Sequence, residues 1–295
     1  APAANTSFFA VLLGSDNGGT VTPTDGSVTS DKLAYPFVVN EDGAAASDFR
    51  VESDSNTHML FVDAGNNKIG INTSSPDDAL HVKGNLFLED SSPEITLETT
   101  NSSHYNWQIA AQENVANSFE IAVGSADADA SNDSFTSTLL INSAGQITKP
   151  LQPMASARPT NAVTNITGDG TLAYLGNSIG ATERFDVGGC FSNDGMLFIA
   201  PVTGKYLLCG QLIFSGLASN HTLSYFMLST SNQSYYPFYG AELDTVGYLG
   251  SFGSAFSVIA DMDANDSAQL AMQVYGGSKV VDASTSTFLT GMLLA

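Results

Sequence analysis

The sequence predicts an all-β protein. Short runs of alternating apolar and polar residues recur from end to end, separated by glycine, asparagine, aspartate and proline, while helix-period patterns are nearly absent. At 295 residues the chain is long enough for two domains of roughly 100–200 residues each. We therefore expect separate β-units that follow one another along the chain.

Composition argues against several classes of function. Nine Lys and Arg against thirty Asp and Glu give a formal net charge of −21, whose field repels nucleic-acid phosphates and anionic lipid. Charged residues make up only 13% of the chain, about half the usual share of about 25%. The polar surface must therefore consist largely of Ser, Thr, Asn and Gly, as in extracellular β-proteins and fibres. We expect no nucleic-acid partner.

Residues 1–40 form a first segment, interpreted as an N-terminal anchor or connector. Its apolar run is far shorter than the roughly 20 residues that span a bilayer, so we expect no membrane insertion. The candidate anchor residues in this run are Phe8, Phe9, Val11 and Leu12. The segment ends in Gly-Ser-Val-Thr-x-x-Lys-Leu (26–33), which resembles connectors in bacteriophage tail-fibre proteins. That resemblance implies contact with other virion proteins.

Residues 41–150 are expected to form a β-rich stem domain. From 61 to 82 the chain reads as a strand, an Asn-rich turn, a short strand, a Ser-Pro stop and a Leu-His-Val strand. Asn66 and Asn67 can supply the positive φ angles of a tight hairpin, and Pro76 can close a strand because it lacks a ladder donor. This unit resembles one in phage fibres and trimeric surface adhesins, which implies a trimeric stem.

Four or five antiparallel strands are expected in the rest of this domain, between residues 95 and 147. Trp107, the single tryptophan of the chain, is interpreted as a core residue of this unit. Alternating Thr and Glu are expected to mark its solvent face. Pro150, Pro153 and Pro159 then predict a Pro-rich linker at 151–163, which separates the stem domain from a head at 164–295.

The predicted head contains a row of apolar strands with turn signals between them, a pattern typical of a two-sheet sandwich. The expected strands are residues 196–199, 204–214, 223–228, 252–259, 269–275 and 287–294. Cys190 and Cys209 lie in this region without a metal-type spacing, and they form either a disulfide or two free buried thiols.

Two sequence signatures in the head are informative about its family. They are Phe198-Ile-Ala-Pro-Val-Thr-Gly204-Lys-Tyr206 and the closing Phe288-Leu-Thr-Gly291 strand. Together they resemble the globular heads of the complement component 1q and tumour necrosis factor families. The resemblance implies a jelly roll that binds ligands as a homotrimer, with these five residues as a head-core signature. The acidic stretch 261–266 departs from the Gly-Asp turn of those families.

No motif predicts catalysis. Residues 176–180 match G-x-S-x-G, but a β pattern follows where a serine hydrolase needs a helix, so we interpret the match as a turn. The four histidines lack zinc-type spacing, and the acidic loops 127–133 and 261–266 lack the Gly and Glu of an EF-hand. We expect no enzyme activity, no cofactor and no metal site.

An aromatic run at 234–240 is bounded by turn residues, where a core role explains aromatics less readily. Tyr235, Tyr236 and Tyr239 could stack on sugar rings or on protein, and they are the candidate receptor contacts. A loop tucked under the trimer is the alternative.

The resemblances lead us to expect a homotrimeric bacteriophage virion fibre, extracellular on the particle, that binds a host-surface glycan or protein. One alternative is an extracellular or cell-surface filament subunit that assembles by N-terminal strand exchange through residues 8–13. A polysaccharide depolymerase is the third reading, and it is disfavoured because no repeat of 20–30 residues is visible.

Overall fold

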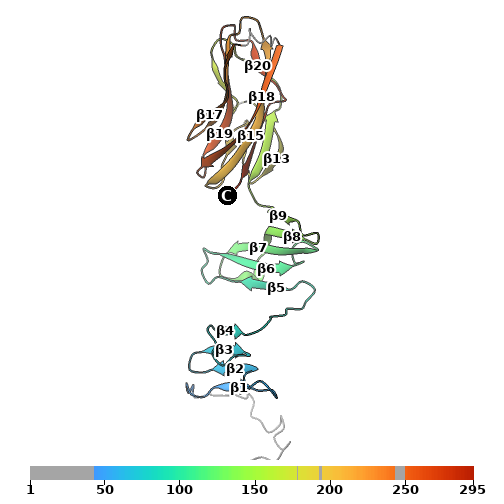
Figure 1. Ribbon diagram of the computed structural model, residues 1–295, viewed down its shortest axis with the longest axis vertical. Helices are drawn as coiled ribbons and strands as arrows, with labels where there is room; N and C mark the ends of the chain where they lie inside the picture. The colour runs from blue at the N-terminus through green and yellow to red at the C-terminus, as the bar shows by residue number, and fades with distance from the viewer. Residues whose placement is uncertain (1–42, 178, 193–194, 243–249) are drawn as a thin grey trace, which may run out of the picture. The chain divides into compact units, whose positions relative to one another are not determined.

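The computed structural model describes residues 43–177, 179–192, 195–242 and 250–295. These residues form β-strands and one short 3-10 helix, η2 (Ala130–Asn132), which confirms the all-β prediction. The chain divides into two compact units, residues 1–87 and 88–295 (Figure 1). The candidate anchor residues Phe8, Phe9, Val11 and Leu12 lie outside the described residues.

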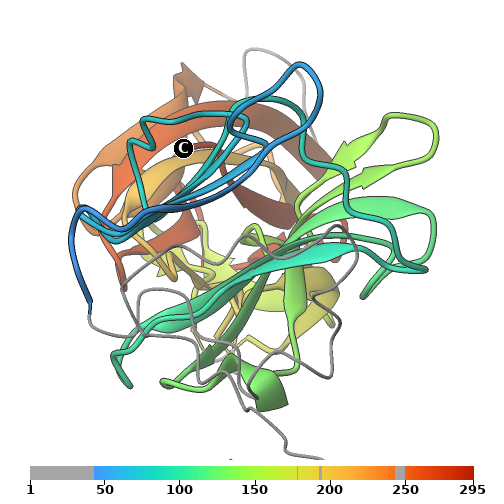
Figure 2. The same ribbon diagram turned by 90° about the horizontal axis from the view of Figure 1, so that it is seen from below.

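The first unit contains a four-stranded sheet in the order β1-β2-β3-β4. Its strands are β1 (Phe49–Val51), β2 (Leu60–Asp63), β3 (Lys68–Ile71) and β4 (Leu80–Val82). β4 joins β3 in parallel, and the other pairs are antiparallel. In Figure 2 these blue strands overlie one another, as expected for a single layer.

The hairpin turn between β2 and β3 depends on two residues. The Asp63 carboxylate accepts hydrogen bonds from the backbone N–H and the side-chain amide of Asn66, both at 2.9 Å. Asn67 then takes a left-handed φ of 55°. Of the two asparagines predicted to have positive φ, only Asn67 does; Asn66 instead donates to Asp63.

The second unit begins with a five-stranded antiparallel sheet in the order β5-β6-β7-β8-β9. Its strands are β5 (Glu94–Leu97), β6 (Tyr105–Ala111), β7 (Ser118–Ala126), β8 (Thr136–Asn142) and β9 (Ile147–Thr148). Cross-strand register places side chains of one kind side by side: Trp107 is opposite Leu97 and Val123, and Ile109 is opposite Ile95 and Ile121.

Both of these sheets have one face made almost entirely of apolar side chains; in the five-stranded sheet Thr136, opposite Val123, is the polar exception. In the five-stranded sheet, the apolar face consists of Ile95, Leu97, Trp107, Ile109, Phe119, Ile121, Val123, Leu139, Ile141 and Ile147. In the four-stranded sheet, it consists of Phe49, Val51, Leu60, Val62, Ile69, Ile71, Leu80 and Val82. Every one of these side chains is partly or largely exposed, and Trp107 is 41% exposed. The expectation that Trp107 is a core residue is therefore wrong for a single chain.

The opposite face of the five-stranded sheet is polar and largely buried. Glu120 is fully buried, and its carboxylate accepts hydrogen bonds from the backbone N–H groups of Asn114 and Val115 and from the Ser137 hydroxyl. Asn106, also buried, donates to Asp127 and Asp133 at 3.0 Å each. Loops of the same chain thus cover the face that was predicted to be exposed to solvent. These loops supply the hydrogen-bond partners of its polar groups.

The rest of the second unit folds as a two-sheet jelly-roll sandwich, whose layers are visible in Figure 1. One sheet has the order β11-β20-β15-β21-β10-β13, with β18 paired to β15. Its strands are β10 (Met154–Pro159), β11 (Val163–Thr167), β13 (Ala181–Val187), β15 (Gly204–Leu217), β18 (Gly250–Met262), β20 (Val281–Ala283) and β21 (Phe288–Leu293).

The facing sheet has the order β12-β19-β16-β17, with β14 paired to β19. Its strands are β12 (Leu172–Tyr174), β14 (Phe198–Ile199), β16 (Leu223–Thr230), β17 (Ser234–Glu242) and β19 (Ser267–Val274). All six strands expected in the head are present. The structure differs at the linker, because residues 154–159 form β10, which lies between β13 and β21. Pro159 is tolerated because it ends the strand, past the last pair with β21.

The head-core signature is largely found in the core. Phe198 and Tyr206 are fully buried, with ring centroids 5.6 Å apart and an interplanar angle of 69°. The backbone of Gly291 lies against the Phe198 ring, where any added Cβ would overlap it, and Gly204 lies similarly against the backbone of Ala295.

Phe288 is the exception in that signature. Its strand alternates, so Leu289 and Gly291 point inward and Phe288 points outward, half-buried. There the Arg184 guanidinium lies 4.8 Å from the centre of its ring. Its assignment to the core is therefore wrong.

Candidate functional site

The aromatic run 234–240 lies in a strand and not in a loop, which corrects the sequence-based interpretation. β17 pairs with β16 along Ser234 to Glu242 and forms one edge of its sheet. The turn before it is closed by Thr230, which exchanges hydrogen bonds with Gln233 through its backbone and its hydroxyl. The aromatic residues of the run are therefore held in a sheet, with side chains on both of its faces.

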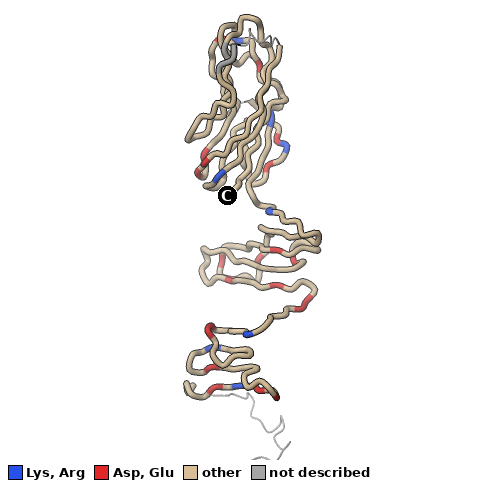
Figure 3. Tube along the Cα trace, in the orientation of Figure 1, with Lys and Arg blue, Asp and Glu red and all other residues tan. Residues whose placement is uncertain are grey.

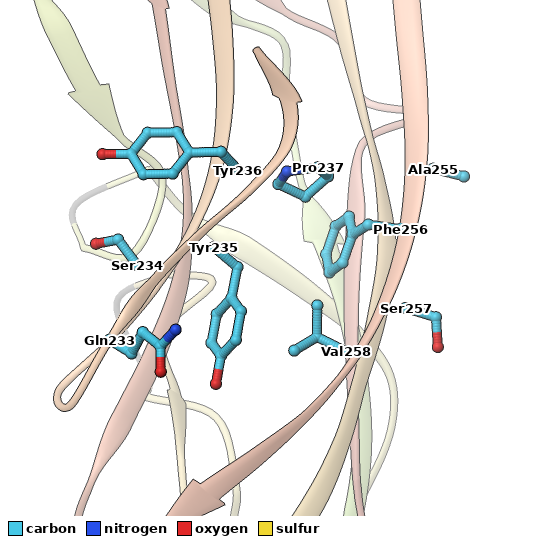
Figure 4. A pocket seen from close by; sticks show the side chains of 9 residues that line it. All are labelled: Gln233, Ser234, Tyr235, Tyr236, Pro237, Ala255, Phe256, Ser257 and Val258. Carbon is cyan, nitrogen blue, oxygen red and sulfur yellow. The ribbon is translucent and has the colours of Figure 1, made fainter.

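The structure separates the three predicted tyrosines. Tyr235 points inward, where it is partly buried and packs against the sandwich core. Tyr236 and Tyr239 stay on the outside, 53% and 71% exposed. Figure 4 shows Tyr235 on the same side as Phe256 and Val258 of β18, while Tyr236 points away from them. Only two of the three candidates therefore share a surface.

Tyr236 and Tyr239 belong to a cluster of four tyrosines, which we call the tyrosine face. It consists of Tyr225, Tyr236, Tyr239 and Tyr275. The ring of Tyr225 lies 4.7 Å from that of Tyr239 and 6.1 Å from that of Tyr275, and Tyr236 lies 5.8 Å from Tyr239. Interplanar angles of 66–87° make all three contacts edge-to-face, a favoured geometry for aromatic pairs.

The surroundings of Tyr275 fix the position of its ring, and those of Tyr225 affect its hydroxyl. Tyr275 packs against Gly170, where an added Cβ would lie 3.0 Å from ring atoms and where φ is +88°. Withdrawal from water raises the pKa of Tyr225, and the neighbouring Tyr239 raises it further. A tyrosine hydroxyl is protonated at neutral pH even without this shift, so Tyr225 can act as a donor.

Sequence reasoning missed Tyr225 and Tyr275. Tyr225 lies on β16, next to β17 in the chain, whereas Tyr275 lies just after β19, about 30 residues further on. The contact of Tyr225 with both Tyr239 and Tyr275 therefore depends on β16 pairing between β17 and β19. The signal that was available is the alternation in 223–228, where Phe226 and Leu228 are buried and Tyr225 must point the other way.

The strands that carry the tyrosine face contain few charged residues. Strands β12, β16 and β19 contain no Asp, Glu, Lys or Arg, and β17 contains one such residue, Glu242 at its end. Flat apolar rings with hydroxyl tips can stack on sugar rings or on aliphatic and aromatic side chains while donating hydrogen bonds. Such a surface suits a neutral ligand better than a strongly charged one.

A cleft of about 550 Å³ lies between β17 and β18, where the edges of the two sheets separate (Figure 4). Tyr235, Phe256 and Val258 line its interior, and Ala255 and Ser257 point away from it. Between residues 207 and 213 of β15 and between residues 251 and 259 of β18, the outward side chains are also uncharged. They are Leu207, Cys209, Gln211, Ile213, Ser251, Ala255, Ser257 and Ile259. The Lys205–Asp261 ion pair marks one end of this surface. Figure 3 shows that most of the sandwich trace is tan, with few positions of Lys, Arg, Asp or Glu.

The two cysteines are free thiols. Burial raises the pKa of Cys190 to about 12, with a further contribution from Asp186, and burial also raises the pKa of Cys209. Neither thiol is activated as a nucleophile. In the part of the chain that the structure describes, no group of three or more His, Cys, Asp or Glu is arranged to hold a metal ion.

Comparisons with known proteins find similarity only among solved structures. No family model and no curated protein matches the chain. Among solved structures, murine APRIL is 14% identical with a TM-score of 0.34, over 48% of this chain and 99% of that one. A globular domain of zebrafish complement 1qA is 13% identical (TM-score 0.29; 49% and 98% covered), and the PRD1 vertex protein P5 is 9% identical (0.35; 49% and 99%). Among the described residues, no helix has the length and apolar character needed to cross a bilayer.

Proposed function

We propose that this chain is the subunit of a homotrimeric bacteriophage virion fibre, and that it attaches the particle to the host through the tyrosine face. The observation that carries the proposal is the contact of four tyrosine rings on one sheet, two of them more than half exposed. The ligand is a neutral region of a host-surface glycan or protein, because the strands of this face are nearly free of charge.

Trimerisation is supported by the surface of β15 and β18. Apart from the Lys205–Asp261 pair at one end, this face carries no charged side chain, and it lies next to an open cleft between two sheet edges. Such a face is a liability for a lone sandwich and is protected when copies pack around a symmetry axis. Three heads on one axis, and several fibres on one virion, would then convert weak contacts into firm attachment through effective concentration.

The test uses the purified full-length protein and its adsorption to host cells, measured by depletion from the supernatant. We expect the double variant Tyr236→Ala/Tyr239→Ala to lower affinity at least tenfold, since one exposed anchor ring can contribute about 2 kcal/mol. Tyr174→Ala is the matched control, because Tyr174 is a 47% exposed tyrosine on β12, two strands away from β16. Unchanged adsorption by a well-folded double variant would contradict attachment through this face.

The filament alternative rests on residues 8–13, which lie outside the described residues. Deletion of residues 1–20 distinguishes it: loss of polymers would favour a filament subunit, whereas trimers that fail to join a virion would favour the fibre.

A further inference from the structure

In a single chain, the five-stranded sheet β5–β9 exposes its apolar face and buries its polar face, which is the reverse of the usual arrangement. An antiparallel sheet normally packs its apolar face on a core and leaves its polar face in water. Here Glu120 and Asn106 are fully buried on the polar side, while Trp107, Phe119 and Ile147 are 41–63% exposed on the apolar side.

The polar face cannot be the surface that awaits a partner, because its groups are already satisfied. The amide of Gln108 donates to Glu94, and Asn114 donates to both Gln108 and Glu120. The backbone N–H of Ala130 donates to Glu98 across the same side. If a partner displaced these loops from the polar face, the buried polar groups would lose their hydrogen-bond partners, which costs about 1–3 kcal/mol for each group.

The four-stranded sheet repeats the arrangement independently. On its other side Phe61 is 8% exposed and meets His58 edge-on at 5.4 Å. On its apolar face Leu80 is 61% exposed and Val51 is 42% exposed. Two sheets in separate units therefore present bare apolar faces, and patches of this kind mark interaction surfaces.

We propose that both apolar faces are covered by the same faces of other copies of this chain, so that the core of each sheet is built between subunits. A different partner would need two apolar surfaces in matching order, whereas a second copy supplies both by symmetry. The faces carry no charged side chain, so copies can meet on them despite a net charge of −21. The number of copies, three, rests on the proposed function.

The single tryptophan gives a direct probe, because Trp107 lies on this face between Leu97 and Val123. Acrylamide is the suitable quencher, since it is neutral and is not repelled by an acidic protein. In the full-length protein at micromolar concentration, we expect the Trp107 fluorescence to be blue-shifted and protected from acrylamide. The substitution Ile109→Lys should raise the quenching constant several-fold, because a lysine cannot be buried between copies without a partner.

The matched control is Thr96→Lys, on the opposite face, where Thr96 is exposed in an acidic pocket that includes Glu94 and Glu98. It should leave Trp107 protected. Ile109 is only partly buried in the single chain, so its replacement should keep the strand pairing, which far-UV circular dichroism checks.

Sedimentation velocity separates this inference from the proposed function. A trimeric wild type whose Trp107 is freely quenched contradicts the proposal that the apolar faces are covered, and it leaves the proposed trimer of heads unaffected. A single chain with Trp107 protected shows that the cover comes from within the subunit, and a single chain with Trp107 accessible shows that nothing covers it. Either of those results overturns the inference and the proposed trimer together.

Discussion

Gly291 allows the centre of the sandwich to pack closely because it has no side chain. The Phe198 ring fills the space that a side chain at Gly291 would occupy, and Phe198 in turn meets Tyr206 edge-on. The Tyr206 hydroxyl donates to the backbone oxygen of Val202 at 2.8 Å, so the buried ring leaves no polar atom unpaired. Three residues from two distant parts of the sequence thus form one packing unit.

The substitution Gly291→Val is therefore expected to destabilise the sandwich by about 1–3 kcal/mol, the usual cost of overpacking a core. The midpoint of denaturant unfolding measures this. Leu294→Ala is the control, since Leu294 is 41% exposed just after the same strand and should change stability by about 0.5 kcal/mol or less. An unchanged midpoint for Gly291→Val would show that Phe198 can move aside.

Glu120 links acidity to the stability of the five-stranded sheet. Burial alone would raise the pKa of Glu120, but hydrogen bonds from Ser137, Val115 and Asn114 outweigh it and hold the pKa below its usual value. Because the pKa in the folded state lies below the unfolded value of about 4.3, this group contributes stability above that pH. The contribution is lost as the pH falls through the folded pKa.

We accordingly expect Glu120→Gln to lower the thermal midpoint at pH 7, where the wild-type carboxylate is charged and accepts three hydrogen bonds. At pH 3 the two proteins should converge, because acid weakens only the wild-type interaction. The fluorescence of Trp107, on the strand next to β7, reports the transition of this sheet. A difference between the proteins that stays constant with pH would contradict the assignment.

The sequence predicted which segments are strands better than it predicted their faces. Alternation and turn residues were sufficient for β2, β6 and the head strands, and the aromatic–glycine motif identified Phe198, Tyr206 and Gly291. The direction of Phe288 failed because residues three apart in a strand point to opposite faces, so Phe288 and Gly291 cannot both face the core. The prediction of which face of the five-stranded sheet is exposed to solvent failed for another reason. Loop residues such as Asn114 cover the polar side, and local periodicity contains no information about such loops.

The contribution of the single strand β10 to the fold can be tested. Three prolines in and near this strand led to the prediction of a linker there. β10 pairs with β13 on one side and with β21 on the other, through Ser156 at the middle of both ladders. A fragment that begins at residue 150 should fold as a sandwich. A fragment that begins at 164 removes β10, exposes two unpaired strand edges and should aggregate or resist folding.

Circular dichroism, limited proteolysis and size-exclusion chromatography of the two fragments measure this outcome. If the shorter fragment is as resistant to protease as the longer one, β10 is dispensable and the boundary belongs where the prolines suggested.

At the scale of the whole molecule, an excess of acid must coexist with association of identical chains. The net charge of −21 keeps copies apart unless the surfaces that meet are free of charge. The outward sides of β15 and β18 meet this condition apart from the Lys205–Asp261 pair at one end, and so do the two bare sheet faces. The acids lie elsewhere, as Glu94 and Glu120 do on the polar side of the five-stranded sheet.

A single carboxylate placed on the outward side of β18 should therefore break the assembly of the heads. Ala255 is exposed in one chain, points away from the cleft and is opposite Gln211 on β15. Ala255→Glu should cost an interface several kcal/mol for each buried carboxylate, and symmetry repeats that cost in every subunit. Leu172→Glu adds the same charge to the outer side of β12, where Leu172 is 40% exposed, and should leave the assembly intact. Sedimentation of the fragment 150–295, once it is shown to fold, measures this free of any contribution from the other sheets. Equal masses for Ala255→Glu and the unsubstituted fragment would place the contact between heads on a different surface.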